Sequence, residues 1–138
     1  MNLRVLCVPL LVCAVALPAA GCSGVTDPSK NKNDDITDVI GPDSAIIRQD
    51  YEFTAAKNGE FSVTITALSN PNAVIGVYVG LINGFGTCSP ALGTNNLAVL
   101  NRTALTGPIN KGNGYCLSVF DNGSLTADVT FTVRLSHP

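Results

Sequence analysis

The sequence has few of the residues on which enzymes commonly depend. Among its 138 residues there is no tryptophan, one histidine and only two glutamates. A Ser-His-Asp triad needs a histidine held on both sides, but His137 lies next to the last residue, and chain ends are usually poorly ordered. The paired carboxylates of a glycosidase need a set separation, and Glu52 and Glu60 are more simply explained as surface charges on strands. We therefore expect no catalytic activity.

Positive charge is also scarce. Eight Lys and Arg residues stand against ten Asp and Glu residues, which gives a formal net charge of −2. A protein that binds nucleic acid needs a basic footprint, so we expect no nucleic-acid partner. No glycine-rich loop follows a strand and opens a helix, so nucleotide binding has no support either.

The one long apolar run is at the N-terminus. Residues 5–17 read VLCVPLLVCAVAL, after Arg4 and before a proline and the small residues at 19–21. A basic start, a short apolar stretch and a small-residue cleavage site are typical of a secretory signal peptide. A transmembrane helix needs about 20 apolar residues, whereas this run is shorter and contains Pro9, which removes a helical hydrogen bond. We expect residues 1–21 to be a signal peptide.

The end of this segment, Ala19-Ala20-Gly21-Cys22, resembles the signal of bacterial lipoproteins, although Ala19 stands where Leu is usual. The resemblance implies that Cys22 receives a diacylglyceryl group on its sulfur, becomes the first residue after cleavage and is acylated on its amine. Ser23, in place of Asp, implies the outer membrane by the sorting rule of enteric bacteria. Stable anchoring takes two or more acyl chains, which such a cysteine carries. The implied protein is lipid-anchored in the cell envelope, with the membrane as a partner.

This interpretation also accounts for an odd number of cysteines. Of the five, two leave with the signal peptide and Cys22 is used by lipid, so Cys88 and Cys116 remain. Disulfides form and persist outside the cytosol, and we expect these two residues to pair. A metal site is a weak alternative, because two cysteines and the distant His137 lack the clustered spacing of zinc ligands.

The segment after the lipidation signal is polar. Residues 23–40 read SGVTDPSKNKNDDITDVI and contain no aromatic side chain. Such a composition buries too little apolar surface to offset the entropy of ordering. We therefore interpret 22–40 as the lipidated cysteine and a disordered tether, with a solvated linker preferred to a calcium site at the NKNDD run.

From residue 41 onward, short apolar alternations predict β-strands. The run 61–68 places Phe61, Val63, Ile65 and Ala67 on one face, and 129–135 alternates in the same way, with a period of two that is typical of half-buried strands. Two further runs, 73–81 and 115–120, are apolar on both faces and suit central strands. The run 97–105 fits either a strand or a helical turn.

Turn residues separate these runs at nearly regular intervals. Gly, Asn, Asp and Pro cluster at 57–59, 69–72, 83–84, 107–108, 112–114 and 121–123. The pattern predicts one all-β domain over 41–138, an antiparallel, jelly-roll-like β-sandwich of about seven to eight strands.

The last third of the chain, GNGYCLSVFDNGSLTADVTFTVRLSHP, resembles the bacterial pre-peptidase C-terminal type of β-sandwich domain. The likeness lies in the 114–119 strand with its Gly-Tyr-x-Leu-x-Val pattern, in the loop at 121–123 and in the final alternating strand at 129–135. Members of that family are usually non-catalytic modules that assist secretion, attachment or substrate contact, and the resemblance implies such a role.

The best candidate for a binding site is the loop 121–128. Asp121, Asn122 and Asp128 offer oxygen ligands of the kind that calcium prefers. Local bonds from these side chains to the backbone are the favoured explanation, so we expect no cofactor, with Ca²⁺ as the alternative. A second candidate is the loop 83–96, because binding residues gather on loops that a rigid scaffold positions.

Aromatic side chains on the outer sheet faces would offer a weak glycan platform. Tyr51, Tyr78 and Phe120 are expected there.

The resulting hypothesis is a non-catalytic, lipid-anchored envelope protein that presents a binding or structural module to a glycan or protein. We expect it in the outer membrane, either periplasmic or surface-exposed. The alternatives are a subunit of a surface fibre or oligomer, since exposed sheet edges permit pairing, and a small secreted hydrolase.

Overall fold

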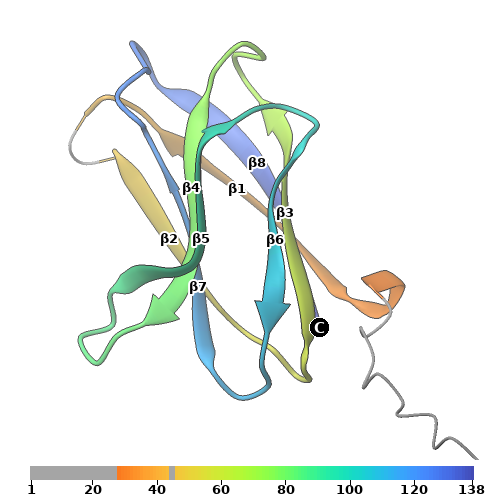
Figure 1. Cartoon of the computed structure of the whole chain (residues 1–138). Helices are drawn as coiled ribbons and strands as arrows, with labels where there is room; N and C mark the ends of the chain where they lie inside the picture. Colours follow the sequence, from red (N-terminus) through yellow and green to blue (C-terminus); the bar gives the residue numbers. More distant parts are fainter. Residues whose placement is uncertain (1–27, 44–45) are drawn as a thin grey trace, which may run out of the picture.

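A computed structural model describes residues 28–43 and 46–138 (Figure 1). This part of the chain forms two four-stranded antiparallel sheets packed face to face, with one short 3₁₀ turn, η1 (Pro28–Lys30). The predicted antiparallel β-sandwich of seven to eight strands is thus confirmed. The strands are β1 (Lys32–Ile40), β2 (Arg48–Thr54), β3 (Gly59–Leu68), β4 (Ile75–Ile82), β5 (Cys88–Ala98), β6 (Thr103–Ile109), β7 (Gly114–Phe120) and β8 (Val129–His137).

The expected signal peptide and the lipidated Cys22 lie outside the described residues. Within the described part of the chain, there is no helix with the length and apolar character needed to cross a bilayer.

The strand order explains which strands are apolar on both faces. One sheet has the order β1-β8-β3-β6 and the other β2-β7-β4-β5. β4 and β7 are the two inner strands of the second sheet and are almost wholly buried, as their sequences predicted. The ambiguous run at 97–105 becomes the end of β5, a turn with Asn101 at φ 59°, and β6.

The main core lies between the sheets and comes largely from their inner strands, β3 and β8 in one sheet and β4 and β7 in the other. Val63, Ile65, Phe131 and Val133 are fully buried, which confirms the period of two. The prediction for Ala67 was wrong, because the pairing of β3 with β8 shifts register between Ile65 and Ala67. An extra residue in one strand turns the following side chains to the other face, so the core receives Leu68 instead.

The interpretation of 22–40 as a tether was wrong for its second half. Residues 32–40 form β1, which pairs with β8 along its whole length. Asp34, Ile36, Asp38 and Ile40 alternate toward the sandwich interior, but two of the four are carboxylates, so the period of two is hidden by polar composition. Inward-pointing charges protect an edge strand from further pairing, which is a physical reason for acidic residues there.

The sandwich has two distinct ends. One end, which we call the lower end, contains the start of β1, the end of β8 and the connections 55–58, 83–87 and 110–113 (Figure 1). The upper end has the connections 69–74, 99–102 and 121–128. The chain therefore enters the domain at the lower end, opposite the candidate loop 121–128. The second candidate loop, 83–96, begins at the lower end and from Cys88 onward belongs to β5, so that part of it is not a loop.

Candidate functional site

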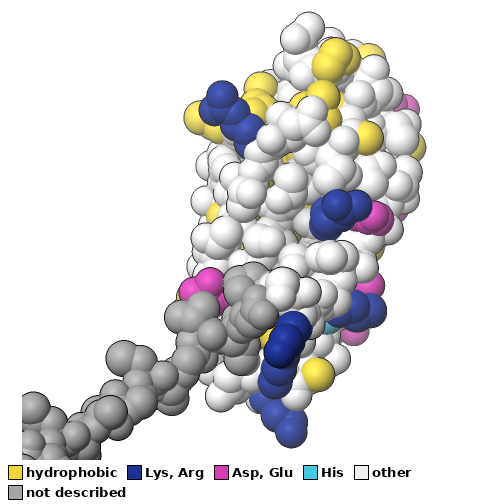
Figure 2. Space-filling view, turned by 90° about the vertical axis from the view of Figure 1, so that its right-hand side faces the viewer, with side chains coloured by type: hydrophobic (Ala, Val, Ile, Leu, Met, Phe, Trp, Pro, Cys, Tyr) yellow, Lys and Arg dark blue, Asp and Glu magenta, His cyan; other side chains and the backbone are white. Residues whose placement is uncertain are grey.

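A cavity of about 430 Å³ lies at the upper end, between the connections 69–74 and 121–128. Apolar groups contribute part of its wall, including Leu97, which is 72 % exposed. Figure 2 shows hydrophobic side chains gathered toward the upper end of the face it presents. The polar groups of the lining are Asn70, Asn72, Asn122, Ser124, Thr126 and Asp128.

Asp121 organises the loop that borders this cavity. Its Oδ1 accepts backbone N–H bonds from Gly123, Ser124 and Leu125 at 2.9, 3.1 and 3.2 Å. Gly123 follows the turn with φ of 88°, a conformation that glycine adopts without a steric penalty. The carboxylate oxygen that was considered as a calcium ligand therefore serves the backbone of its own loop.

Asn122 ties the same loop to the end of β5. Its Nδ2 donates to the carbonyl of Asn96 at 2.6 Å, and its Oδ1 accepts from the N–H of Ser124 at 3.0 Å. Ser124 Oγ donates in turn to the carbonyl of Val74 at 3.1 Å. The cavity wall is consequently held from several segments, which is what a preformed binding surface requires.

Asp128 lies in the cavity lining, and its carboxylate packs against Gly41, where an added Cβ would collide with it. Across residues 28–43 and 46–138, no group of three or more His, Cys, Asp or Glu side chains is positioned to hold a metal ion. Oδ1 of Asp121 and Oδ1 of Asn122 each accept hydrogen bonds from the backbone of their own loop.

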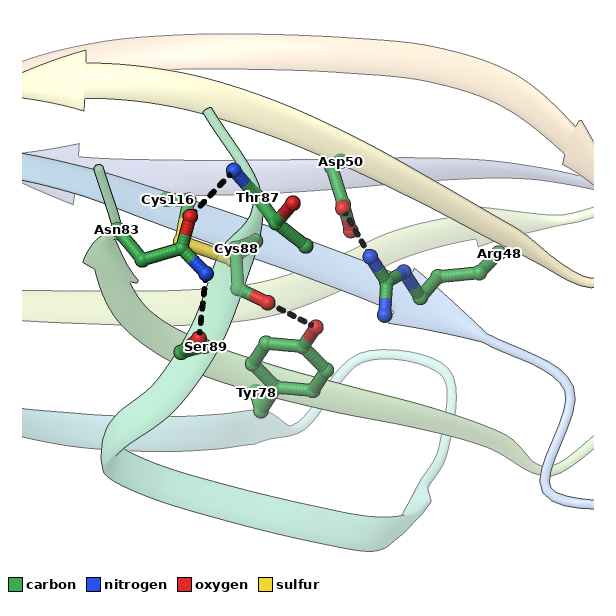
Figure 3. Close-up of a disulfide and its surroundings, with 8 residues drawn as sticks. All are labelled: Arg48, Asp50, Tyr78, Asn83, Thr87, Cys88, Ser89 and Cys116. Carbon is green, nitrogen blue, oxygen red and sulfur yellow. Dashed lines mark hydrogen bonds and ion pairs between the residues drawn. A yellow bond between two sulfur atoms is a disulfide. The ribbon is translucent and has the colours of Figure 1, made fainter. Parts of the chain in front are cut away.

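The disulfide between Cys88 and Cys116 is present, as predicted, with an S–S distance of 2.02 Å. It lies in a second apolar cluster with Tyr78 on the outer face of the β2-β7-β4-β5 sheet. In Figure 3 the Tyr78 hydroxyl donates to the carbonyl of Cys88, at 3.2 Å. The bridge joins the start of β5 to β7 across the strand β4 that lies between them.

The first part of β5 folds over this outer face at Gly80. The pairing of β4 with β5 shifts register between Val79 and Gly80, and a Cβ at Gly80 would lie 1.8 Å from the carbonyl oxygen of Ser89. Only a residue without a Cβ allows the two backbones to come so close. This fold-over covers the disulfide, which leaves Cys116 fully buried and Cys88 only 4 % exposed.

The predicted aromatic platform on the outer face does not form. Tyr78 is buried, and its ring lies 5.8 Å from that of the half-buried Phe120. Tyr51 is half-buried against the main core, and its hydroxyl donates to Asp38 Oδ2 at 2.9 Å. Burial, together with that carboxylate, raises the pKa of the Tyr51 hydroxyl. The prediction failed because β5 covers one tyrosine and β1 contacts the other.

His137 is ordered and buried, contrary to the expectation for a residue near the chain end. Its Nε2 lies 3.0 Å from Asp34 Oδ2, and its ring packs 5.1 Å from that of Phe53. Hydrogen bonds from Lys32 and then from His137 lower the pKa of the Asp34 carboxyl. β1 supplies Asp34, so the strand missed in the sequence is also what orders the histidine.

A second cavity, of about 380 Å³, lies beside this histidine at the lower end. Asp34, Glu52, Thr54 and His137 contribute to its lining. Two separate catalytic candidates of the sequence, Glu52 and His137, therefore line the same cavity. Nδ1 of His137 is buried and has no hydrogen-bond partner among the described residues.

Comparison of the chain with protein-family models found no match, and comparison with curated proteins found none either. The fold and the candidate site are therefore described from this structure alone. Sequence reasoning located the 121–128 side of the upper cavity but missed the 69–74 side. The signal for it was the Ser69-Asn70-Pro71-Asn72 run, which we interpreted only as a turn between strands.

Proposed function

We propose that this chain is a non-catalytic, lipid-anchored protein of the bacterial cell envelope, held in the outer membrane through Cys22. Its role is to present the upper end of the sandwich as a binding surface. The observation that carries the proposal is the position of β1. It begins at Lys32, ten residues after Cys22, at the end of the domain opposite the 430 Å³ cavity. An acylated Cys22 would leave the cavity facing away from the membrane.

The length of the linking segment fits this arrangement. Ten residues span at most about 35 Å when fully extended, so the lower end stays near the headgroups while the upper end remains accessible. A rigid scaffold with binding groups on its loops is a common design for recognition. Here the disulfide and the Asp121 bonds supply that rigidity.

The cavity lining favours a glycan as the ligand. Amide, hydroxyl and carboxylate side chains pair well with sugar hydroxyls, because each offers donors or acceptors in a fixed direction. Asn72 and Thr126 lie in the lining beside the apolar side chain of Leu97, so polar and apolar contacts are both available. A site of this kind binds through a few placed polar groups on a partly apolar surface.

The structural use of His137 supports the absence of catalysis. Its Nε2 contacts Asp34 and its ring packs against Phe53, so the side chain joins β8 to both β1 and β2. This structural role accounts for the burial of His137, so a catalytic role is not needed to explain it. The position of Glu52 in the same cavity favours one alternative, a small hydrolase that uses this pair for acid-base chemistry.

The fibre alternative has less support from the sheet edges. β1 is an edge strand, and its inward-facing Asp34 and Asp38 oppose pairing with another chain. An assembly would have to use another edge.

Mass spectrometry of the mature N-terminus tests the anchor. We expect the first residue to be Cys22 carrying acyl chains, and Cys22→Ser to leave the protein unprocessed or released from membranes. Cleavage at another residue, or a free N-terminal cysteine, would contradict the proposal.

A glycan array on the mature protein tests the binding surface. Asn72→Ala with Thr126→Ala should abolish any signal, whereas Asn33→Ala, an exposed change on β1 at the far end, should preserve it. Signal that survives the double change would place binding elsewhere. Hydrolysis of glycans, esters or peptides that is lost in both His137→Ala and Glu52→Gln would instead establish the hydrolase.

A further inference from the structure

The tip of the β4–β5 hairpin carries the most exposed apolar side chain among the large hydrophobic residues described. Phe85 is 95 % exposed, and neither the main core nor the cluster around the disulfide includes it. Water contact with a whole phenyl ring is unfavourable, and burial of that ring in an apolar medium is correspondingly favourable. Phe is one of the side chains that membrane-bound surfaces bury at the boundary between headgroups and acyl chains.

The hairpin holds Phe85 in place. Asn83 Oδ1 accepts the backbone N–H groups of Phe85 and Thr87, both at 3.0 Å. The N–H of Gly86 donates to the Asn83 carbonyl, and the N–H of Asn83 donates to the carbonyl of Thr87, also at 3.0 Å. Cys88 follows immediately and is fixed by the disulfide (Figure 3). A preorganised tip loses little entropy when the ring is inserted elsewhere.

The position of this hairpin limits what the ring would meet. It lies at the lower end of the domain, where the chain enters through β1 (Figure 1). Leu81, 39 % exposed, precedes it on β4 at the same end. Under the proposed function, the acylated cysteine ties this end to the bilayer by ten residues.

The lysines of the described chain gather at the same end. They are scattered in the sequence, and none lies at the upper end. Figure 2 shows several Lys and Arg side chains toward the lower end of the face it presents, with others at mid-height and at the upper end. Two of the lysines come from the turns β2–β3 and β6–β7 and two from the start of the described chain: Lys57, Lys111, Lys30 and Lys32.

Three of these lysines, Lys30, Lys57 and Lys111, take part in no salt bridge within the described residues. Ammonium groups and an exposed aromatic ring at the same end of a domain complement a bilayer surface, where phosphates lie above the acyl chains.

We propose that the lower end docks on the bilayer that carries the protein, with Phe85 inserted among the headgroups and the lysines on lipid phosphates. This inference rests on the proposed lipid anchor and adds a second contact to it. The domain would then stand on the membrane in a preferred orientation, with the upper cavity outward, instead of rotating freely on its tether.

The absence of tryptophan provides a direct test. Phe85→Trp introduces a single tryptophan at the tip, and Leu97→Trp, at a solvent-facing position on the upper end, is the matched control. Each acylated, full-length mature protein is reconstituted into vesicles of phosphatidylethanolamine and phosphatidylglycerol, and flotation measures the anchor separately. We expect the emission of the Phe85→Trp variant to shift to shorter wavelength, with quenching by doxyl-labelled lipid and severalfold less quenching by aqueous iodide.

The results separate the two proposals. If both variants float and both indoles remain equally open to iodide, docking is overturned and the anchor stands. If neither variant floats, the anchor fails and docking fails with it. If only the Phe85→Trp indole is shielded, docking is supported.

A charge change supplies a second criterion. Lys111→Glu should weaken the lipid quenching measured with Phe85→Trp, whereas Arg102→Glu, an equal change of charge at the upper end, should not. If the two changes reduced the lipid quenching equally, the proposed contact of the lysines with lipid phosphates would be overturned.

Discussion

Replacement of Gly80 by alanine is expected to loosen the fold-over of β5 that covers the disulfide. The new Cβ would lie 1.8 Å from the carbonyl oxygen of Ser89 and 2.6 Å from its carbonyl carbon. Since Cβ contacts below 3.0 Å are essentially never found, the two strands would have to separate by at least 1.2 Å, the difference between 3.0 and 1.8 Å. No side-chain rotation relieves the overlap, because both colliding atoms belong to the backbone.

The magnitude follows from the cost of overpacking. Extra methyl groups in a packed site cost about 1–3 kcal/mol, and a rigid backbone neighbour places Gly80→Ala at the upper limit. For a domain of about 100 residues, that loss lowers Tm by roughly 12–20 °C. The displacement also acts on the hydrogen bond from Tyr78 to the carbonyl of Cys88, because Ser89 follows directly in the chain.

Thermal unfolding followed by circular dichroism measures the effect, with urea unfolding as a second measurement. Gly93→Ala is the matched control on β5, because the nearest atom to its added Cβ is a leucine methyl at 3.4 Å. We expect this control to stay within about 0.5 kcal/mol of the parent. Equal stabilities of Gly80→Ala and Gly93→Ala, with the disulfide intact in both, would refute the close approach of β5 to β4.

Three further changes test other parts of the structure. Combined Cys88→Ala and Cys116→Ala should lower the free energy of unfolding by about 3.5 kcal/mol, from the loop entropy of a 28-residue separation. Reductant should destabilise the parent in urea unfolding but leave this variant unchanged. Asp34→Asn should destabilise the protein at neutral pH, and the two unfolding curves should converge in acid. The hydrogen bond from Lys32, and then that from the histidine, hold the folded pKa of Asp34 below its ordinary 3.8, so its contribution is present above about pH 4 and is lost as pH falls through the folded pKa. A constant difference between the curves at all pH values would contradict this linkage. Tyr115→Phe should cost about 1–2 kcal/mol, because its hydroxyl both accepts from and donates to the turn before β7, at 2.8 and 3.0 Å; an unchanged urea midpoint would argue against these bonds.

Local pattern determined much of the sandwich. The alternation in β3 and β8 requires only that one face be buried, and the doubly apolar β4 and β7 require cover on both faces. Each strand shows these requirements in its own sequence, so the central positions of β4 and β7 could be predicted. The disulfide also followed from the sequence, because the expected lipidation of Cys22 left two cysteines to pair. In the loop 121–128, Asp121 was correctly favoured as a residue that bonds its own backbone, since that contact is only two to four residues long.

The remaining features depend on contacts between distant segments. The sequence of β1 is too polar to predict a strand. In the folded protein β8 supplies the backbone hydrogen bonds of β1, and the inward aspartates, Asp38 and Asp34, contact Tyr51 and His137. The upper cavity exists only where the connections 69–74 and 121–128 meet.

The positions of Tyr78 and Phe85 were decided in the same way. Both are aromatic residues of the β4–β5 hairpin, yet the fold-over of β5 at Gly80 buries the first, and the tight turn set by Asn83 leaves the second in water. The sequence by itself determined most of the strand pattern and the disulfide, because each depends on residue type and spacing, and the lipid anchor stays a prediction made on the same basis. Only the tertiary structure decided which side chains meet and which end of the domain each loop occupies, because those outcomes depend on pairing between strands far apart in the chain.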